Sequence, residues 1–530
     1  MDGPVGFLAV VLHAHLPFVR HLEHDDFLEE RWLFEAITET YLPLLQRFQR
    51  LGEERIPCGL TMSVTPTLLA MLADPSLQAR YLRHLERLLE LSAKEIDRTR
   101  WQPAFHRLAW FYHHRFKTAH HLYVNVFHRN LIQPLRELSD RGVVELIASG
   151  ATHGYLPLME TQPAAVRAQI QVGIEAFAHA FGKRPAGFWL PECGYHPGHD
   201  EFLKACGIRY CVTDAHGVLF GSPRPRYGVY APVVCPSGVA VFGRDLESSK
   251  SVWSAEEGYP GDGDYRDFYR DIGHDLDYDY VRPYLNGDGT RVNTGIKYYR
   301  ITGKTDDKQP YDPDRALEKA AQHAGNFLFN RGKQAEYLRS VIDRVPVIVS
   351  PYDAELFGHW WFEGPDWLEL LMRKAQADQT GLQPISLSDY FDHYPTNQVL
   401  EPCLSSWGHG GYSDVWLNGS NDWIYRHVHK MAERMTQLAD EHPQADGLRA
   451  RALNQMAREL LLAQASDWAF ILKTQTHTAY AYRRLHRHLA RFTHLYDAIR
   501  HDRLDAAQLA EIEASDRLFP FLDYRIYATP

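Results

Sequence analysis

Two acidic residues occur where a short apolar run ends abruptly. Glu192 follows the run in GFWLPECGYHPG, and Asp353 follows the run in VPVIVSPYDAELFGHWW. Residues directly after the strands of a parallel barrel project into its carboxyl-terminal face, where catalytic groups gather. We therefore expect the two carboxyl groups to face each other across one mouth. Either carboxylate alone could equally cap a helix or pair with an arginine, but the nearby Trp189, Trp360 and Trp361 favour a ligand cleft.

A pair of carboxyl groups suits the cleavage of a glycosidic bond. One carboxylate attacks the anomeric carbon while a second, protonated group donates to the leaving oxygen, and retention of configuration requires a separation of about 5 to 5.5 Å. Apolar surroundings and the charge of Glu192 would raise the pKa of Asp353. The pattern therefore predicts Glu192 as nucleophile and Asp353 as general acid and base. Glu355 is a rival for the acid role that spacing does not exclude.

Three histidines also follow predicted strands. His13 and His15 lie in HAHLP after the first strand, and His153 lies in ELIASGATHGYLP after the third. We expect their imidazoles to hydrogen-bond with sugar hydroxyls and carboxylates at the same mouth. A zinc site is the alternative, because His-x-His with a carboxylate can bind this metal, and buried structural histidines are another. The segments GDGDY and NGDG lack the final glutamate of a calcium loop and are read as turns.

The chain that positions these residues alternates strand and helix patterns. Short apolar runs are typical of strands buried on both faces, and amphipathic stretches such as 28–51 and 164–181 lie between them. The alternation predicts parallel strands joined by right-handed crossovers, in an α/β fold. A count near seven favours a barrel, with runs at 5–12, 58–63, 143–149, 187–190, 208–213, 239–242 and 345–350.

Two insertions and a change of pattern divide the chain further. Residues 66–142 are mostly helical in pattern, and residues 244–344 open with loop signals. Beyond about residue 400 the strand patterns fade, and heptad-like patterns occupy 422–440, 444–465 and 476–500. We predict a catalytic barrel over residues 1–398 and a helical domain over residues 399–530 that contributes to the cleft.

The amino-acid composition limits the classes of molecule that the protein would bind. A net charge of −10 without a basic run argues against nucleic acid and membrane partners, and 12% aromatic residues suit a neutral sugar. Six cysteines without a C-x-x-C pair predict neither a disulfide framework nor a zinc ribbon, and favour the cytoplasm. The first apolar run follows Asp2 and is read as a strand, not a signal peptide. No apolar run approaches the ~18 residues of a membrane span.

Taken together, HAHLP, ELIASGATHGYLP, GFWLPECGY and YDAELFGHWW resemble the motifs of glycoside hydrolase family 57, most closely its 1,4-α-glucan branching enzymes. The resemblance runs from His13 to Asp467. It implies an incomplete seven-stranded (β/α) barrel with a C-terminal all-α domain, no metal and no organic cofactor. It also implies a glycosyltransferase of glycogen biosynthesis, which passes an α-1,4-glucan segment through a covalent intermediate on Glu192 to a 6-hydroxyl.

Three further stretches carry the resemblance to branching enzymes: EERWLFEAI, SSWGHGGYSDVWLNG and QASDWAFIL. The family also has a mobile loop with a functional tyrosine after the fifth strand, for which Tyr227 and Tyr230 are the candidates. The alternatives are an α-amylase or 4-α-glucanotransferase of the same family and, outside it, a non-catalytic binding protein or a metal-dependent deacetylase. The resemblance implies substrate contacts for His13, His15, Trp32, His153, Trp407, Trp416 and Asp467, and, through a variable insertion, for Arg270 and Gly287.

Overall fold

A curled, mostly parallel sheet forms the centre of the computed structural model, which describes residues 3–24, 26–254, 256–377 and 381–529. All seven predicted strands are confirmed, and the path through them runs β7-β5-β4-β3-β2-β1-β8. A short β6 (Val233–Val234) pairs antiparallel with β7, and β9 (Leu382–Pro384) pairs with β1. The seven strands are β1 (Gly6–Ala14), β2 (Leu60–Val64), β3 (Val144–Ser149), β4 (Gly187–Trp189), β5 (Tyr210–Thr213), β7 (Ala240–Gly243) and β8 (Val347–Asp353).

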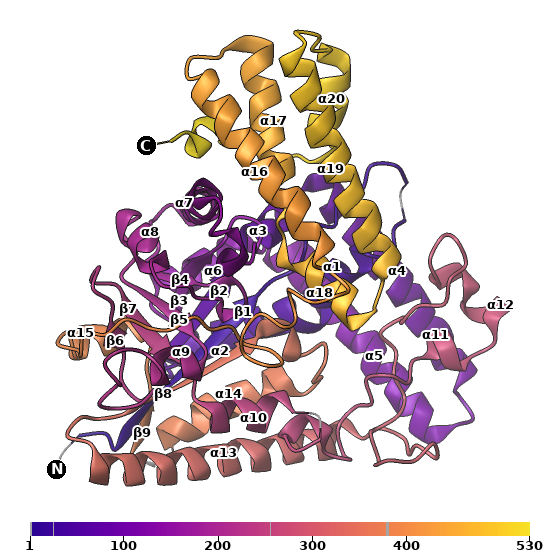
Figure 1. Cartoon of the computed structure of the whole chain (residues 1–530). Coiled ribbons are helices and arrows are strands. Elements are labelled where there is room, and N and C mark those ends of the chain that lie inside the picture. Colours follow the sequence, from indigo (N-terminus) through magenta and orange to yellow (C-terminus); the bar gives the residue numbers. More distant parts are fainter. Residues whose placement is uncertain (1–2, 25, 255, 378–380, 530) are drawn as a thin grey trace.

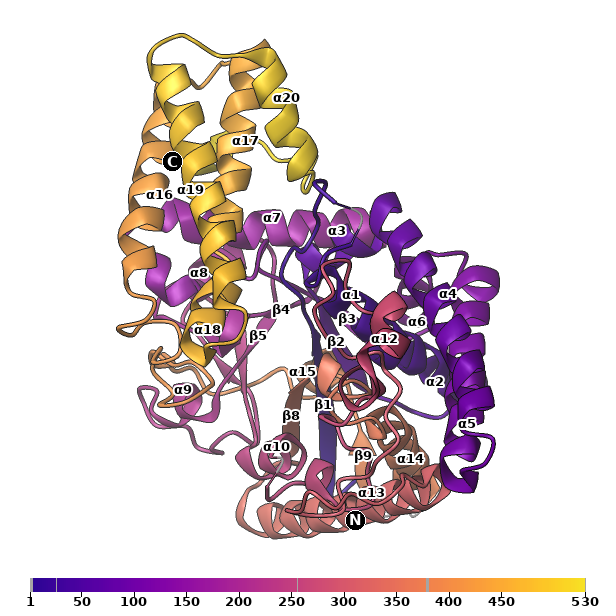
Figure 2. The same ribbon diagram turned by 90° about the vertical axis from the view of Figure 1, so that its right-hand side faces the viewer.

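The two ends of this path approach each other. The amide of Asp245, just after β7, donates to the carbonyl of Val349 in β8 at 2.8 Å, and the amide of Val347 donates to the carbonyl of Tyr230 at 3.0 Å. Strands at opposite ends of a sheet can meet only if the sheet curls, and strand twist supplies that curvature. The fold is therefore the predicted incomplete (β/α)7-type barrel, with its strands fanned around one axis (Figure 2).

Helices cover the barrel as the sequence predicts. The predicted 28–51 stretch is one continuous helix from Glu30 to Glu53 with a π-helical turn inside it, and the predicted 164–181 stretch forms α7. At Gly173 of α7 a Cβ would lie 2.1 Å from the carbonyl oxygen of Ser149, so glycine lets this helix lie directly against the end of β3. These helices are α1 (Glu30–Ala36), the π turn η1 (Ile37–Tyr41), α2 (Leu42–Glu53), α7 (Pro163–Phe181), α8 (His199–Ala205), α9 (Ala215–Leu219), α14 (Gly364–Ala377) and α15 (Leu387–His393).

The two insertions form the side and the base of the molecule. Figure 2 shows α4 and α5 upright beside the strands and the long α13 across the base, at the end from which the strands start. The first insertion contains α3 (Pro66–Leu72), α4 (Pro75–Arg98), α5 (Pro103–His121) and α6 (Ile132–Asp140). The second contains α10 (Leu246–Trp253), α11 (Ile272–Asp275), α12 (Tyr278–Val281) and α13 (Pro313–Val341).

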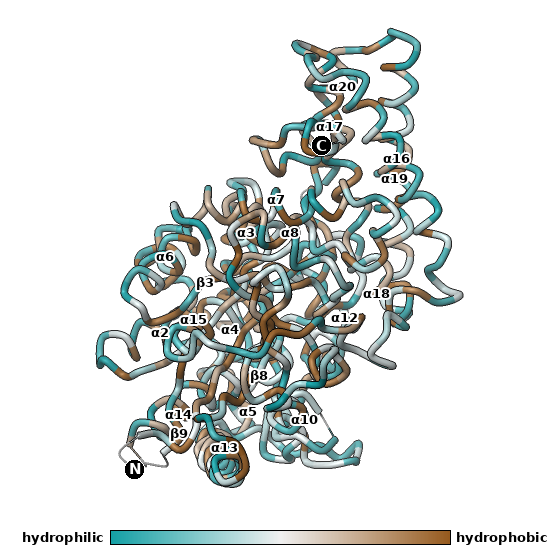
Figure 3. Tube along the Cα trace, turned by 60° about the vertical axis from the view of Figure 1, so that its left-hand side comes forward, coloured by the Kyte–Doolittle hydropathy of each residue, from teal (hydrophilic) through white to brown (hydrophobic). Residues whose placement is uncertain are grey.

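The C-terminal part is helical and rises as a bundle from the opposite end (Figure 1). The predicted heptad stretches form three of its helices, while α18, at the foot of the bundle, and α20 were not predicted. Hydrophobic segments concentrate along the strands at the centre (Figure 3), and no helix in the described part of the chain is long and apolar enough to cross a membrane. The bundle comprises α16 (Trp423–Glu441), α17 (Gly447–Ala463), α18 (Ser466–Thr474), α19 (Thr478–Arg500) and α20 (Ala506–Ser515).

Candidate active site

Glu192 lies in a single 3-10 turn, Pro191–Cys193, two residues beyond the end of β4. Its φ of 61° and the φ of 50° at Cys193 are both left-handed, a region that residues other than glycine rarely adopt. Such backbone strain persists where surrounding contacts hold it, and it clusters at functional sites. The turn ends the strand abruptly, and the side chain of Glu192 is only 13% exposed.

Both carboxylate oxygens of Glu192 accept a hydrogen bond from residues far along the chain. The indole Nε1 of Trp407 donates to Oε2 at 2.7 Å, and the hydroxyl of Ser466 donates to Oε1 at 2.8 Å. Burial raises the pKa of Glu192 above its usual value, while these two donors favour the ionised form and oppose the rise. The predicted nucleophile is thus oriented by the C-terminal part of the chain.

Asp353 is the last residue of β8, and in the strand register it lies beside His13 of β1. Its carboxyl group makes no side-chain hydrogen bond within the described residues. Burial raises the pKa of Asp353 to about 8, and the charges of Glu355 and Glu192 add to the rise. The carboxyl group is therefore protonated at neutral pH, as a general acid requires.

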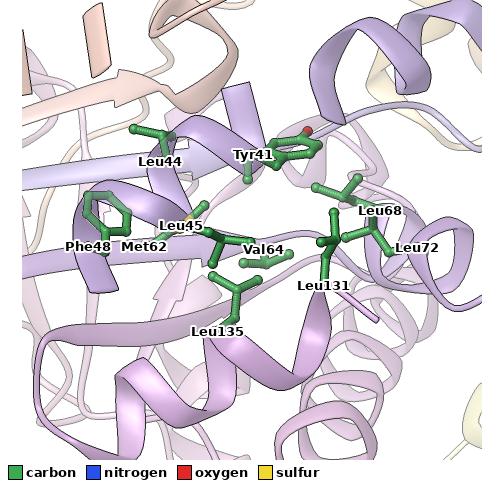
Figure 4. Close-up of a pocket in the computed structure, with 11 residues that line it drawn as sticks. Tyr41, Leu44, Leu45, Phe48, Met62, Val64, Leu68, Leu72, Leu131 and Leu135 are labelled. Carbon is green, nitrogen blue, oxygen red and sulfur yellow. The ribbon is translucent and has the colours of Figure 1, made fainter. Parts of the chain in front are cut away.

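Glu355, the rival for this role, has a different environment. Its Oε1 accepts hydrogen bonds from the hydroxyl of Tyr41 at 2.5 Å and from the amide of His15 at 3.2 Å. Burial raises the pKa of Glu355, but these donors favour its ionised form. Figure 4 shows Tyr41 beside an apolar cavity of about 20 Å³ that is lined mostly by aliphatic side chains. Glu355 is therefore placed to act on the pKa of Asp353.

The hydrogen bonds around His15 define its charge. The hydroxyl of Thr67 donates to the carbonyl of Leu16 at 2.8 Å, so the 3.2 Å contact between Thr65 and Thr67 requires Thr65 to donate. The oxygen of Thr65 must then accept from Nδ1 of His15 at 3.1 Å, while Nε2 donates to Asp467 at 3.0 Å. An imidazole that donates from both nitrogens is a cation.

The electrostatic surroundings of His15 also favour its charged form. Burial alone would lower the pKa of His15, but the adjacent Asp467 raises it, with further contributions from Glu192 and Glu355, and the net shift is upward. The site therefore holds one imidazolium among its carboxyl groups. His13 and His153 differ, because burial holds their pKa values well below the usual range and the charge of His15 lowers them further.

Trp32 and Trp416, both predicted to contact substrate, pack against other aromatic rings. Trp416 is 1% exposed and stacks on Tyr155 with ring centroids 4.8 Å apart, so it presents no open face to a sugar here. The ring is covered by the segment after β3, and the predicted substrate contact of Trp416 stays a prediction. Trp32 is half-buried and meets His477 and Tyr480 edge-on at 5.3 and 5.8 Å.

The second insertion holds the two residues predicted from a variable region. Arg270 pairs with Asp275 at 3.0 Å and lies 4.4 Å from the ring centroid of Tyr299. Gly287 is exposed and lies next to Asp26. Within the described residues, no hydrogen bond or ion pair joins either of them to the groups around Glu192, so their predicted substrate contacts stay predictions.

Neither candidate tyrosine of the mobile loop faces this mouth. The hydroxyl of Tyr227 donates to Asp343 at 2.5 Å, and the carbonyl of Tyr230 accepts from Val347, the first residue of β8. Asp353 is at the other end of that strand. Both tyrosines therefore lie at the opposite end of the barrel from the carboxyl groups of Glu192 and Asp353.

Two groups of side chains among the described residues have the spacing of a metal site, and neither contains His13, His15 or His153. One is Glu160, His196 and His199 beside the active-site loops, and the other is the buried set Glu459, His488 and Asp516 in the C-terminal bundle. The nitrogens of the three active-site histidines are instead engaged with each other, with hydroxyls and with Asp467.

Sequence reasoning missed Ser63, which contacts His13, and three further residues of this site. Ser466 contacts Glu192, Tyr41 contacts Glu355, and Thr65 contacts His15. Ser466 lies inside QASDWAFIL, where attention to the residue before Asp467 could have found it. Tyr41 and Thr65 carry no such signal, because each is one polar residue in an otherwise ordinary helix or strand end.

The sequence model described as Glycosyl hydrolase family 57 matches residues 9–402, well over half of the chain. The chain belongs to glycoside hydrolase family 57. A second model, described as 1,4-alpha-glucan branching enzyme, C-terminal, matches residues 427–527 of this family 57 protein. That range includes Ser466 and Asp467.

Similar proteins are named either as branching enzymes or as an alpha-amylase. A 1,4-alpha-glucan branching enzyme of Thermococcus kodakarensis is 33% identical over 551 residues, covering 97% of this chain and 77% of that relative. A GH57-type branching enzyme from Pyrococcus horikoshii matches with a TM-score of 0.89 at 32% identity, covering 99% of this chain and 97% of that one. A structure described as the novel alpha-amylase AmyC from Thermotoga maritima matches with a TM-score of 0.93 at 44% identity, covering 99% of both.

Proposed function

We propose that this chain is a 1,4-α-glucan branching enzyme, which cuts an α-1,4 link with retention and transfers the segment to a 6-hydroxyl. One observation carries the proposal. The part of the chain that resembles the C-terminal region of branching enzymes reaches the nucleophile through Ser466 and contacts His15 through Asp467. The substrate is an amylose-like or glycogen-like glucan.

The reaction has two steps at one carbon. Glu192 attacks the anomeric carbon while Asp353 donates its proton to the departing oxygen, which leaves a glucan segment esterified to Glu192. Asp353, now ionised, takes the proton from an acceptor 6-hydroxyl, whose oxygen attacks the same carbon and frees Glu192. Two inversions give net retention, so the new link is α-1,6.

The surroundings suit substrate binding as well as catalysis. The second carboxylate oxygen of Asp467 is buried and accepts no hydrogen bond within the described residues, so an unused acceptor lies beside His15. Trp32 offers a partly open ring near the same helices. The contacts proposed for Arg270, Gly287 and Trp416 rest on resemblance, and Trp416 would act through Tyr155.

Hydrolysis is the second candidate. It is favoured by the name of the 44% identical structure and by the position of Tyr227 and Tyr230 away from the mouth. Water and the acceptor compete for the same ester, and water is present at roughly 55 M. The acceptor wins only if binding gives it a high effective concentration at the anomeric carbon.

Treatment of amylose distinguishes the two. We expect the wild type to remove the iodine colour with little rise in reducing ends, because each cut is followed by a new link. An α-1,6 debranching enzyme should then release short chains from the product. A rise of reducing ends in step with colour loss, with nothing released on debranching, would make the protein an amylase.

The pH profile tests the role of Glu355. With the pKa of Asp353 at about 8, kcat/KM should fall as pH rises through that value, because the acid loses its proton. Glu355→Gln removes a negative charge that raises this pKa, so the basic limb should move down by about one pH unit. Glu54→Gln, at an exposed ion pair with Arg373, is the control and should leave the limb in place. An unmoved limb in Glu355→Gln would contradict the assignment.

We also propose that the protein is cytoplasmic. All six cysteines are unpaired, which suits the reducing cytoplasm. The division near residues 398 and 399 follows the last strand, β9, and precedes α16. We propose that the helical part after this point completes the active-site cleft.

A further inference from the structure

A line of buried side chains connects β2 to the carboxylate of Glu192. The hydroxyl of Ser63 lies 3.3 Å from Nδ1 of His13, and Nε2 of His13 lies 2.9 Å from Nε2 of His153. Nδ1 of His153 lies 2.9 Å from the hydroxyl of Ser466, which lies 2.8 Å from Oε1 of Glu192. The first four residues are at most 3% exposed.

Only one direction of hydrogen bonding satisfies this line when both histidines are neutral. An ionised carboxylate can only accept, so Ser466 donates its single proton to Glu192 and must accept from Nδ1–H of His153. A neutral imidazole has one N–H, so Nε2 of His153 accepts from Nε2–H of His13. Nδ1 of His13 then accepts from the hydroxyl of Ser63.

Ring geometry fits this scheme. The centroids of His13 and His153 are 4.9 Å apart, well beyond the 2.9 Å between their Nε2 atoms, so the two nitrogens lie between the rings and point at one another. Neutrality follows from the surroundings, because both rings are buried and the imidazolium of His15 lies with its centroid 3.9 Å from that of His153. A second cation this close would be repelled.

The backbone holds both ends of the line. His13 and Ser63 are partners in the register of β1 and β2. At the other end, the amide of Ser466 donates to the carbonyl of His153 at 3.1 Å, and Gly154 forms an isolated bridge with Ala465. His153 has a left-handed φ of 58°. These contacts fix the loop after β3 against the start of α18.

We propose that Ser466 is a positioning residue for Glu192 and that His13 and His153 orient the nucleophile through it, in a one-directional hydrogen-bond relay that begins at Ser63. The relay holds Oε1 and favours the ionised carboxylate, while Trp407 holds Oε2. This rests on the proposed role of Glu192 as nucleophile. In this proposal the two neutral histidines orient the nucleophile, a role separate from the sugar contact predicted for them.

Removal of the Ser466 hydroxyl is the direct test. A hydrogen bond to a charged group contributes about 1.5 to 3 kcal/mol, so Ser466→Ala should lower kcat about 10- to 100-fold. The KM for amylose should stay within about threefold, since the hydroxyl contacts the nucleophile and not the glucan. Loss of a donor raises the pKa of Glu192, so the acidic limb of the kcat profile should move to higher pH.

Two variants separate positioning from structural damage. Ser466→Thr keeps the hydroxyl and should restore most of kcat and the wild-type limb. Ser405→Ala removes another fully buried serine hydroxyl, one without a hydrogen-bond partner in the described part of the chain, and should leave kcat and the limb unchanged. A kcat for Ser466→Ala within about twofold of wild type with an unmoved limb, or a threonine variant as impaired as the alanine variant, would overturn the proposal.

Neutron diffraction from deuterated wild-type crystals locates the hydrogen positions of the relay without any substitution. We expect deuterium on Nε2 of His13 and on Nδ1 of His153, with Nε2 of His153 bare. Deuterium on Nε2 of His153 reverses the relay and overturns it.

The kinetic assay measures the total loss of iodine colour from amylose, which branching and hydrolysis both cause. Amylose that yields reducing ends alone therefore ends the branching proposal and leaves the relay standing. An active Glu192→Gln ends the nucleophile assignment instead, and the neutron map still decides the relay.

Discussion

Glu192→Gln should lower the rate of α-1,4 bond cleavage in amylose by about 10⁴-fold or more, because a neutral amide cannot form the glycosyl ester. The fold should survive. The amide oxygen can accept from Trp407, and the amide nitrogen can donate to Ser466, whose oxygen has a free lone pair. Initial rates with amylose and the midpoint of thermal unfolding measure the two effects.

Glu54→Gln is the matched control for that substitution, since it makes the same chemical change at an exposed ion pair. It should keep the wild-type rate. If Glu192→Gln retains more than about a tenth of the wild-type rate, covalent catalysis by this residue is excluded.

Asp353→Asn should show a loss that depends on the leaving group. With amylose, absence of the proton donor should lower the rate of cleavage about 10²- to 10⁴-fold. With α-maltosyl fluoride the first step should be far less affected, because fluoride departs without a proton. Azide should then accelerate turnover of the fluoride, since it attacks the ester without a general base. Stopped-flow fluoride release and azide-dependent rates measure both steps.

Asparagine has the shape of aspartic acid, and Asp353 makes no side-chain hydrogen bond within the described residues, so packing should be preserved. Glu355→Gln is the comparison, because Glu355 affects the pKa of Asp353 and does not donate the proton. Equal losses with amylose and with the fluoride in Asp353→Asn would contradict the acid and base assignment. A leaving-group dependence in Glu355→Gln would transfer the role to Glu355.

The barrel could be predicted because its signals are local. A strand buried on both faces is a short apolar run, and each of the seven runs became a strand within a few residues. The same logic placed Glu192 and Asp353, since a polar residue directly after such a run projects from the carboxyl end of the sheet. The short edge strands β6 and β9 have two and three residues and carry no comparable pattern.

The contacts around the carboxyl groups could not be predicted, because they join distant parts of the chain. Ser466 reaches Glu192 across 274 positions, and Tyr41 reaches Glu355 across 314. No periodicity encodes such an approach. The burial of the Trp416 ring could not be predicted either. The resemblance implies a substrate contact for this residue, and the segment after β3 covers its ring with Tyr155.

Capture of the intermediate tests the central claim most directly. Asp353→Asn incubated briefly with α-maltosyl fluoride should accumulate a maltosyl ester, because the second step lacks its base. Quenching, digestion and mass spectrometry should then find the added maltosyl mass on the peptide that contains Glu192, and azide added before the quench should remove it. A label on Glu355 or Asp467, or an active enzyme that never accumulates a label, would contradict a glycosyl-enzyme on Glu192.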